Sequence, residues 1–204
     1  MSTNPSESLV RFEEIYRNAN GEDAGVPWAD KAPRGRLAAW LAGHPGEGRL
    51  AIDVGCGLGD NAALLAGAGY KVTAFDLSQS AIAWAKRRHA GRGIDFHTAD
   101  LFQVPADWRG SFALVHETYN LQALPLELRA GAVRAIAALL APGGQLLVLA
   151  RLREEGETVV GPPIPVTRAE VRGFEAAGLR DEGSEEFTDE RQIRHVQAVY
   201  QKPA

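Results

Sequence analysis

The chain lacks several features that would point to particular classes of protein. It has one cysteine, Cys56, among 204 residues, so no intrachain disulfide can form. Such sparing use of cysteine fits a reducing compartment. No run approaches the ~20 apolar residues that a transmembrane helix needs, and the polar, acidic start MSTNPSESLVRFEE is unlike a signal or transit peptide. We therefore expect a cytoplasmic protein with no membrane partner.

The chain also has no excess of positive charge. Its formal net charge is −4 and its pI is about 5.8, whereas a nucleic-acid enzyme normally carries a basic footprint that replaces phosphate counterions. The one basic run, KRRH at residues 86–89, falls where a helix should end, and cations are favoured there by the helix dipole. The histidines show no metal-ligand spacing. We expect no nucleic-acid partner and no metal.

What is present is a regular alternation of elements in a chain of one domain's length. From residue 48 onwards, short apolar runs that predict strands alternate with helical stretches, which indicates a doubly wound, mostly parallel α/β sheet. Strands are expected at 50–54, 71–75, 93–97, 112–116 and 145–150, and helices at 59–68, 78–90 and 126–140. We expect a single domain, 1–204, with an N-terminal helical part (1–47) before a Rossmann-like core (48–204).

The end of the chain departs from this alternation. Thr167 and Glu170 have the spacing of a capping box, which predicts a helix that ends at Gly178. Two strand-like segments follow, 180–187 and 193–201, with only a short turn between them. Strands so close in sequence pair antiparallel, so we expect a reversed strand at the edge of the sheet.

The strongest local signal is the sequence AIDVGCGLGD at residues 51–60. An apolar strand leads into Gly55, Gly57 and Gly59 and then into a helix, as in sites where a ligand lies against the backbone. Nicotinamide sites favour the spacing G-x-G-x-x-G, but here the third glycine comes one residue early. Asp53 would also repel a pyrophosphate, whereas it suits a ligand with an ammonium group and no phosphate. Cys56, between two of the glycines, is expected to be a small residue that fits the turn.

Two further acidic residues follow the next two predicted strands. Asp76, with Leu77 after it, lies about 20 residues beyond the glycine segment, where a carboxylate can accept both ribose hydroxyls. The alternative is that Asp76 only begins the turn before a helix capped by Ser78. Asp100 and the apolar residues after it, among them Phe102, could contact an adenine ring, or Asp100 could simply end its strand.

Together these segments, over roughly residues 48–152, resemble the class I S-adenosylmethionine-dependent methyltransferases. The resemblance implies a seven-stranded sheet with a reversed strand, and S-adenosyl-L-methionine as cofactor. It also implies a role for each motif. The methionine part of the cofactor would be held by Asp53 and the backbone of 55–59, the ribose by Asp76, and the adenine by Asp100 and Leu101.

The methyl acceptor should be determined near the sequence VHETYN at residues 115–120. Methyltransferases that act on amides or nucleobases usually have Asn/Asp-Pro-Pro-Tyr here, and this chain has no such proline pair. His116 and Glu117 are adjacent, so on a regular strand they point to opposite faces. His116 could be a general base or part of the cofactor pocket, and Glu117 could be a base or pair with an arginine. Arg151 and Arg153 could reach an anionic acceptor or could be solvated.

The N-terminal part, with residues 12–16, 26–29 and 37–41, resembles the thiopurine and thiol methyltransferases. In that group a helix and a loop with a tryptophan close over the cofactor, and Trp28 matches that tryptophan. A Pro-Trp pair can also form a rigid lid that stacks on a ligand and excludes water, although Trp28 could instead pack in the core. A thiol acceptor would need little acid–base assistance, because a thiolate is already a strong nucleophile.

We therefore expect methyl transfer from S-adenosylmethionine to a small-molecule acceptor, most simply a thiol. An O- or N-methyltransferase that uses Glu117 or His116 as base is the alternative. Two further hypotheses are a nicotinamide-dependent oxidoreductase and a cofactor-binding module without catalytic activity.

Overall fold

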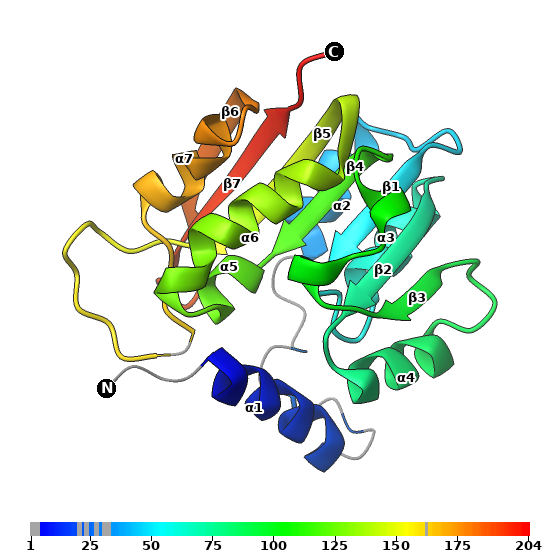
Figure 1. Cartoon of the computed structure of the whole chain (residues 1–204), viewed down its shortest axis with the longest axis horizontal. Helices are drawn as coiled ribbons and strands as arrows, with labels where there is room; N and C mark the ends of the chain where they lie inside the picture. Colours follow the sequence, from blue (N-terminus) through cyan, green and yellow to red (C-terminus); the bar gives the residue numbers. More distant parts are fainter. Residues whose placement is uncertain (1–4, 20–21, 23–24, 27–28, 30–33, 162) are drawn as a thin grey trace. The chain divides into compact units, whose positions relative to one another are not determined.

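The computed structural model describes residues 5–19, 22, 25–26, 29, 34–161 and 163–204, without the side chains of 5–11 and 34. The chain divides into two compact units, Met1–Asp100 and Leu101–Ala204, and each is described by itself (Figure 1). The single domain predicted over 1–204 stays a prediction.

The first unit contains three parallel strands in the order β3-β2-β1. These are β1 (Leu50–Val54), β2 (Lys71–Asp76) and β3 (Asp95–Thr98), close to the predicted ranges. The register places Asp53 opposite Ala74 and Val54 opposite Phe75. Helix α3 (Asp60–Gly67) connects β1 to β2, and α4 (Gln79–Arg88) connects β2 to β3. The carboxyl ends of β1 and β2 are therefore adjacent, which brings the glycine segment beside Asp76.

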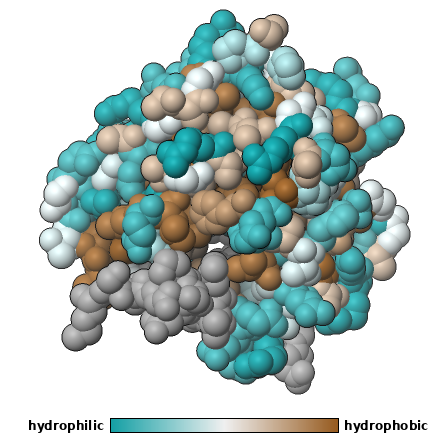
Figure 2. Space-filling model, in the orientation of Figure 1, coloured by the Kyte–Doolittle hydropathy of each residue, from teal (hydrophilic) through white to brown (hydrophobic). Residues whose placement is uncertain are grey.

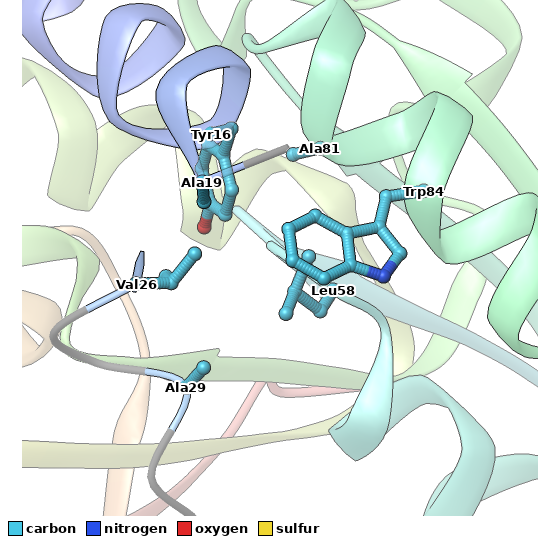
Figure 3. Close-up of a cluster of buried hydrophobic side chains, with 7 residues drawn as sticks. All are labelled: Tyr16, Ala19, Val26, Ala29, Leu58, Ala81 and Trp84. Atoms are coloured by element: carbon cyan, nitrogen blue, oxygen red, sulfur yellow. The ribbon is translucent and has the colours of Figure 1, made fainter. Parts of the chain in front are cut away.

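Two helices precede β1: α1 (Pro5–Asn18) and α2 (Arg34–Ala42). Beyond α1, the buried Ala19, Val26 and Ala29 join a hydrophobic cluster with Tyr16 of α1 (Figure 3). Leu58 from the glycine segment and Ala81 and Trp84 from α4 complete the cluster. Tyr16 and the buried residues after α1 are thus packed against the glycine segment and α4, the two elements that follow β1 and β2.

The second unit contains four strands in the order β4-β5-β7-β6. They are β4 (Phe112–Thr118), β5 (Leu140–Arg151), β6 (Arg180–Thr188) and β7 (Arg194–Gln201). β5 is parallel to β4, and β7 is antiparallel to both β5 and β6. β5 begins at Leu140 rather than at residue 145, because helix α6 (Leu126–Leu139) runs into it without a loop. The reversed strand is therefore β7, between β5 and the edge strand β6.

Short helices that the sequence did not predict fill the connections of the second unit. They are η2 (Leu101–Gln103), η3 (Ala106–Trp108) and α5 (Asn120–Ala123). Helix α7 (Arg168–Ala176) begins with the predicted capping box, in which Thr167 and Glu170 each accept a backbone N–H from the other. Gly178, with a φ of 88°, ends it in the left-handed conformation that glycine favours.

The seven strands, mostly parallel and with one reversed, confirm the predicted doubly wound α/β fold. Hydrophilic residues cover most of the face seen in Figure 2, with hydrophobic patches in its lower half. The large hydrophobic side chains that are exposed, among the described residues, are Leu50, Leu77, Phe102, Leu126 and Val160. In the same part of the chain no helix is long and apolar enough to cross a membrane.

Candidate functional site

The glycine segment adopts a backbone conformation that requires its glycines. Gly55, Gly57 and Gly59 have φ angles of 57°, 52° and 79°, in the left-handed region where a side chain is strained. The turn is fixed to β2, because the Cys56 N–H donates to the carbonyl oxygen of Phe75 at 2.8 Å. The prediction that this turn needs glycine is confirmed by these angles, and its contact with the cofactor stays a prediction.

Asp76 holds the glycine segment and the start of α4 in place. One carboxylate oxygen accepts the Gly57 N–H and the other accepts the Ser78 N–H, both at 2.9 Å. Ser78 is also the cap of α4, since its Oγ accepts the Ala81 N–H at 3.0 Å. Each carboxylate oxygen has a second lone pair, so Asp76 can still accept two hydroxyl donors. The turn-forming role and the ligand-binding role are therefore compatible.

Burial raises the pKa of Asp76, and repulsion from the carboxylates of Asp53 and Glu13 adds to the effect. The hydrogen bonds from Ser78 and Gly57 oppose it. Asp53 itself is only 2% exposed. Three carboxylates thus surround the glycine turn, an environment that favours a cationic ligand group over a phosphate.

The surroundings of Cys56 disfavour the thiolate form that a nucleophile needs. Burial raises the pKa of its thiol, and the negative charges of Asp53 and Asp76 raise it further. A thiol that stays protonated is a poor nucleophile. This agrees with the prediction that Cys56 is a small residue that fits the turn.

Two side chains of α1, neither of them a predicted site residue, contact this site. A Cβ placed on Gly57 would lie 2.7 Å from the Tyr16 hydroxyl oxygen, so this phenol lies directly against the glycine turn. The Glu13 carboxylate accepts Ser78 Oγ at 2.6 Å and Ser80 Oγ at 2.5 Å. Burial opposes ionisation of Glu13, but these hydrogen bonds prevail and lower its pKa. Helix α1 is therefore held at the Asp76 turn by polar bonds as well as by the hydrophobic cluster.

Two apolar side chains that follow the predicted cofactor-binding carboxylates are exposed. Leu77, directly after Asp76 in the first unit, is 41% exposed, and Phe102 in the second unit is 38% exposed. Asp100 follows β3, and Leu101 begins η2. Their contacts with adenine stay predictions, and Trp28 lies outside the described residues.

In the second unit, β4 ends with two buried ionisable residues. His116 is 1% exposed and its Nε2 lies 2.8 Å from Thr118 Oγ1. Glu117 is fully buried, and its Oε1 accepts the N–H groups of Asn120 at 2.6 Å and Leu121 at 3.1 Å. Glu117 therefore binds the first N–H groups of α5 rather than an arginine, and its role as a base stays a prediction.

Burial raises the pKa of Glu117 to about 7, although the hydrogen bonds from Leu121 and Asn120 lower it. Its second oxygen, Oε2, is buried without a hydrogen-bond partner. Tyr119, two residues on, has a φ of 65°, which is strained for a residue with a side chain and is often found at functional sites. The end of β4 thus combines a carboxyl group whose pKa is near 7 with a strained backbone.

Comparison with known proteins identifies the fold that these features build. A family model described as a methyltransferase domain matches residues 51–144, which include the glycine turn, Asp76 and the end of β4. The chain contains a methyltransferase domain. It is 28% identical over 165 residues to a 2-heptyl-1-hydroxyquinolin-4(1H)-one methyltransferase of Mycobacteroides abscessus. That match covers 79% of this chain and 72% of the relative.

Solved structures have the same fold. A 1,6-didemethyltoxoflavin-N1-methyltransferase of Burkholderia thailandensis, crystallised with S-adenosylhomocysteine, matches with a TM-score of 0.78 and 19% identity. The match covers 99% of this chain and 92% of that one. The [4+2]-cyclase SpnF also matches, with a TM-score of 0.79, 18% identity and coverage of 100% and 98%. At such identities the likeness shows the fold alone.

The cofactor of the methyltransferase domain is S-adenosylmethionine. The residues present fit this group. Three positive-φ glycines form a turn of the kind that binds such ligands through its backbone, the nearby carboxylates suit the cationic methionine part, and Asp76 keeps lone pairs for two hydroxyls. The domain is thus an S-adenosylmethionine-dependent methyltransferase.

Proposed function

We propose that the methyltransferase domain transfers the methyl group to a small acceptor that needs no base from the protein, most simply a thiol. The observation that carries this proposal is the state of Glu117, the candidate base. Its carboxylate is fully buried and one oxygen is used by the N–H groups of α5. His116 is also buried and interacts with Thr118.

A thiol suits such a site because a useful fraction of it is ionised near neutral pH. The protein then has to align the acceptor sulfur with the methyl carbon and exclude water. This is the chemistry implied by the resemblance of the N-terminal part to the thiopurine and thiol methyltransferases. Within this proposal Trp28 belongs to the lid, and Glu13 and Tyr16 help to hold that lid closed.

The cofactor-binding roles are part of the same proposal. In the first unit, the backbone of 55–59 and Asp53 hold the methionine part, Asp76 holds the ribose, and Leu77 lies against the adenine. The remaining roles come from the sequence pattern. Adenine is assigned to Asp100, Leu101 and Phe102, and His116 is assigned to the pocket wall.

A specific observation also favours a second candidate, the methylation of an acidic hydroxyl group. The name of the Mycobacteroides relative gives a hydroxyquinolinone as its substrate. A carboxyl group whose pKa is about 7, as in Glu117, is well matched to general-base catalysis near neutral pH. For this function Glu117 would have to reach the acceptor.

One experiment separates the candidates. The full chain is incubated with methyl-labelled S-adenosylmethionine and pairs of acceptors that differ only in a thiol or a hydroxyl, such as thiophenol and phenol. Wild type is compared with Glu117→Gln, with the exposed Glu127→Gln as matched control. A calorimetric titration with adenosylhomocysteine confirms that each variant binds the cofactor product.

The thiol proposal predicts turnover of the thiol of each pair, with less than a threefold loss in Glu117→Gln. If only the hydroxyl acceptors are methylated, and Glu117→Gln loses about 10²-fold or more of that activity, the thiol proposal is wrong and the second candidate replaces it. If adenosylhomocysteine binds but no acceptor is methylated, the proposal of small, simple acceptors is wrong.

A further inference from the structure

Arg151 differs from the other arginines near it in the second unit. Arg129 donates to Glu170 at 2.9 Å and to the Ile164 carbonyl oxygen at 2.5 Å. Arg153 donates to the Pro165 carbonyl oxygen at 2.9 Å. Arg168 and Arg194 bind glutamate carboxylates. No acceptor bonds the Arg151 guanidinium within the described residues, and its Nε is buried without a hydrogen-bond partner.

The backbone of Arg151, in contrast, is held on both sides. Its N–H donates to the side-chain oxygen of Gln122 at 2.8 Å, and its carbonyl oxygen accepts the Val166 N–H at 2.9 Å. A buried donor without an acceptor is costly, so a rigidly placed arginine of this kind calls for an explanation. An acceptor that comes from outside the chain supplies one.

The surroundings of Arg151 are aromatic. Its guanidinium carbon lies 5.5 Å from the centre of the Tyr119 ring, and that ring is 5.9 Å from the ring of His195. Phe187 stacks on His195, with the ring centres 5.1 Å apart. Arg151 is the last residue of β5 and Tyr119 follows β4. The carboxyl ends of parallel strands are where ligands bind in α/β folds, so this group lies at the expected edge of the sheet.

The nearby ionisable groups leave the positive charge of Arg151 available. Asp189 is the neighbouring carboxylate: hydrogen bonds to its Oδ1 from Ile193 and Arg191 lower its pKa, and the charges of His195 and Arg151 add to this. Its Oδ2 lies 4.0 Å from His195 Nε2, and among the described residues no salt bridge joins it to Arg151. Burial lowers the pKa of His195, so its ring is mainly neutral near pH 7 and does not compete for an anion. A planar guanidinium beside an aromatic ring binds carboxylates and similar anions in a fixed orientation.

We infer that Arg151 and Tyr119 form a subsite for an acceptor that carries a carboxylate or a comparable planar oxyanion. The inference rests on the proposed function, because it names the class of acceptor that this methyltransferase domain takes. It also separates the two arginines at this strand end. Arg151 binds the acceptor, whereas Arg153 holds the loop before α7.

The test uses benzoate as the probe and benzamide as its neutral isostere, with binding to the full chain followed by ligand-observed NMR. Titrations are made with and without saturating adenosylhomocysteine. The variants are Arg151→Met, which removes the charge, and Arg151→Lys, which keeps the charge but loses the planar fork. Arg134→Met, an exposed position on α6, is the matched control.

We expect wild type to bind benzoate at least tenfold more tightly than benzamide. Arg151→Met should lose about tenfold or more in benzoate affinity, Arg151→Lys should lose less, and Arg134→Met should not change. Equal binding of benzoate and benzamide by wild type would overturn the inference without any variant, as would an unchanged affinity in a folded Arg151→Met. Failure of adenosylhomocysteine to bind would refute the proposed cofactor site. The benzoate and benzamide affinities would still decide whether Arg151 binds a carboxylate.

Discussion

Replacement of Glu117 by glutamine tests the most unusual ionisable group in the second unit. The folded chain raises the pKa of Glu117 from its ordinary 4.5 to about 7, chiefly because the group is buried. The folded state therefore binds a proton more tightly than the unfolded state does. Between these two pKa values the folded state carries more protons, so the free energy of unfolding falls as the pH rises.

The size of the effect follows from the shift. A pKa raised from 4.5 to about 7 corresponds to about 3 kcal/mol of lost stability once the group is fully ionised. Glutamine is neutral at every pH and can still accept the N–H groups of α5 through its amide oxygen. We expect Glu117→Gln and wild type to be similarly stable near pH 4.5 and the variant to be more stable by up to about 3 kcal/mol at pH 8.

Urea denaturation followed by circular dichroism, at half-unit intervals from pH 4.5 to pH 8, measures the difference. The exposed Glu127→Gln should give a curve parallel to that of wild type. If the stability of Glu117→Gln also runs parallel to wild type across this range, Glu117 is not held near neutral pKa and the reasoning fails. Activity of the same variant shows separately whether the carboxylate acts as a base.

Three further predictions concern single contacts. Asp76→Ala should weaken adenosylhomocysteine binding in calorimetry by at least tenfold, because the carboxylate that we propose for the ribose and its bond to Gly57 are lost, whereas the exposed Asp107→Ala should bind normally. Gly57→Ala should destabilise the chain by about 2 kcal/mol in urea denaturation, because its φ is 52° and the new Cβ would lie 2.7 Å from the Tyr16 hydroxyl oxygen. The control Gly67→Ala should not destabilise it, because no atom lies within 4 Å of the new Cβ. An equal loss of stability in the two variants would contradict this explanation. Arg129→Met should cost about 3–5 kcal/mol in the same assay, because it leaves buried partners unpaired; a loss below about 1 kcal/mol would show that those partners find water.

Much of the fold and part of the site could be predicted from the sequence, because their causes are local. Apolar runs gave the positions of the strands, and the spacing of Thr167 and Glu170 gave the start of α7. The glycines of 55–59 mark a turn that only glycine enters at low cost, as their positive φ angles show. The ribose-binding role of Asp76 is predicted from its distance along the chain from that turn and stays a prediction. In each case the decisive partners are near in sequence or fixed by the order of parallel strands.

Only the tertiary structure decided which polar side chains are already occupied. Glu13 reaches Ser78 and Ser80, 65 and 67 residues away in sequence, and nothing in the helical pattern of α1 indicates that partner. The sequence offers no reason to assign different roles to Arg151 and Arg153, which lie at and just after the end of β5. In the structure Arg153 donates to the Pro165 carbonyl oxygen, whereas the Arg151 guanidinium has no acceptor among the described residues. Periodicity and motif spacing are local properties of the chain, whereas hydrogen bonds between distant residues depend on how folding places them. The sequence therefore determined the fold and the glycine turn. The packing determined which polar groups remain available for chemistry.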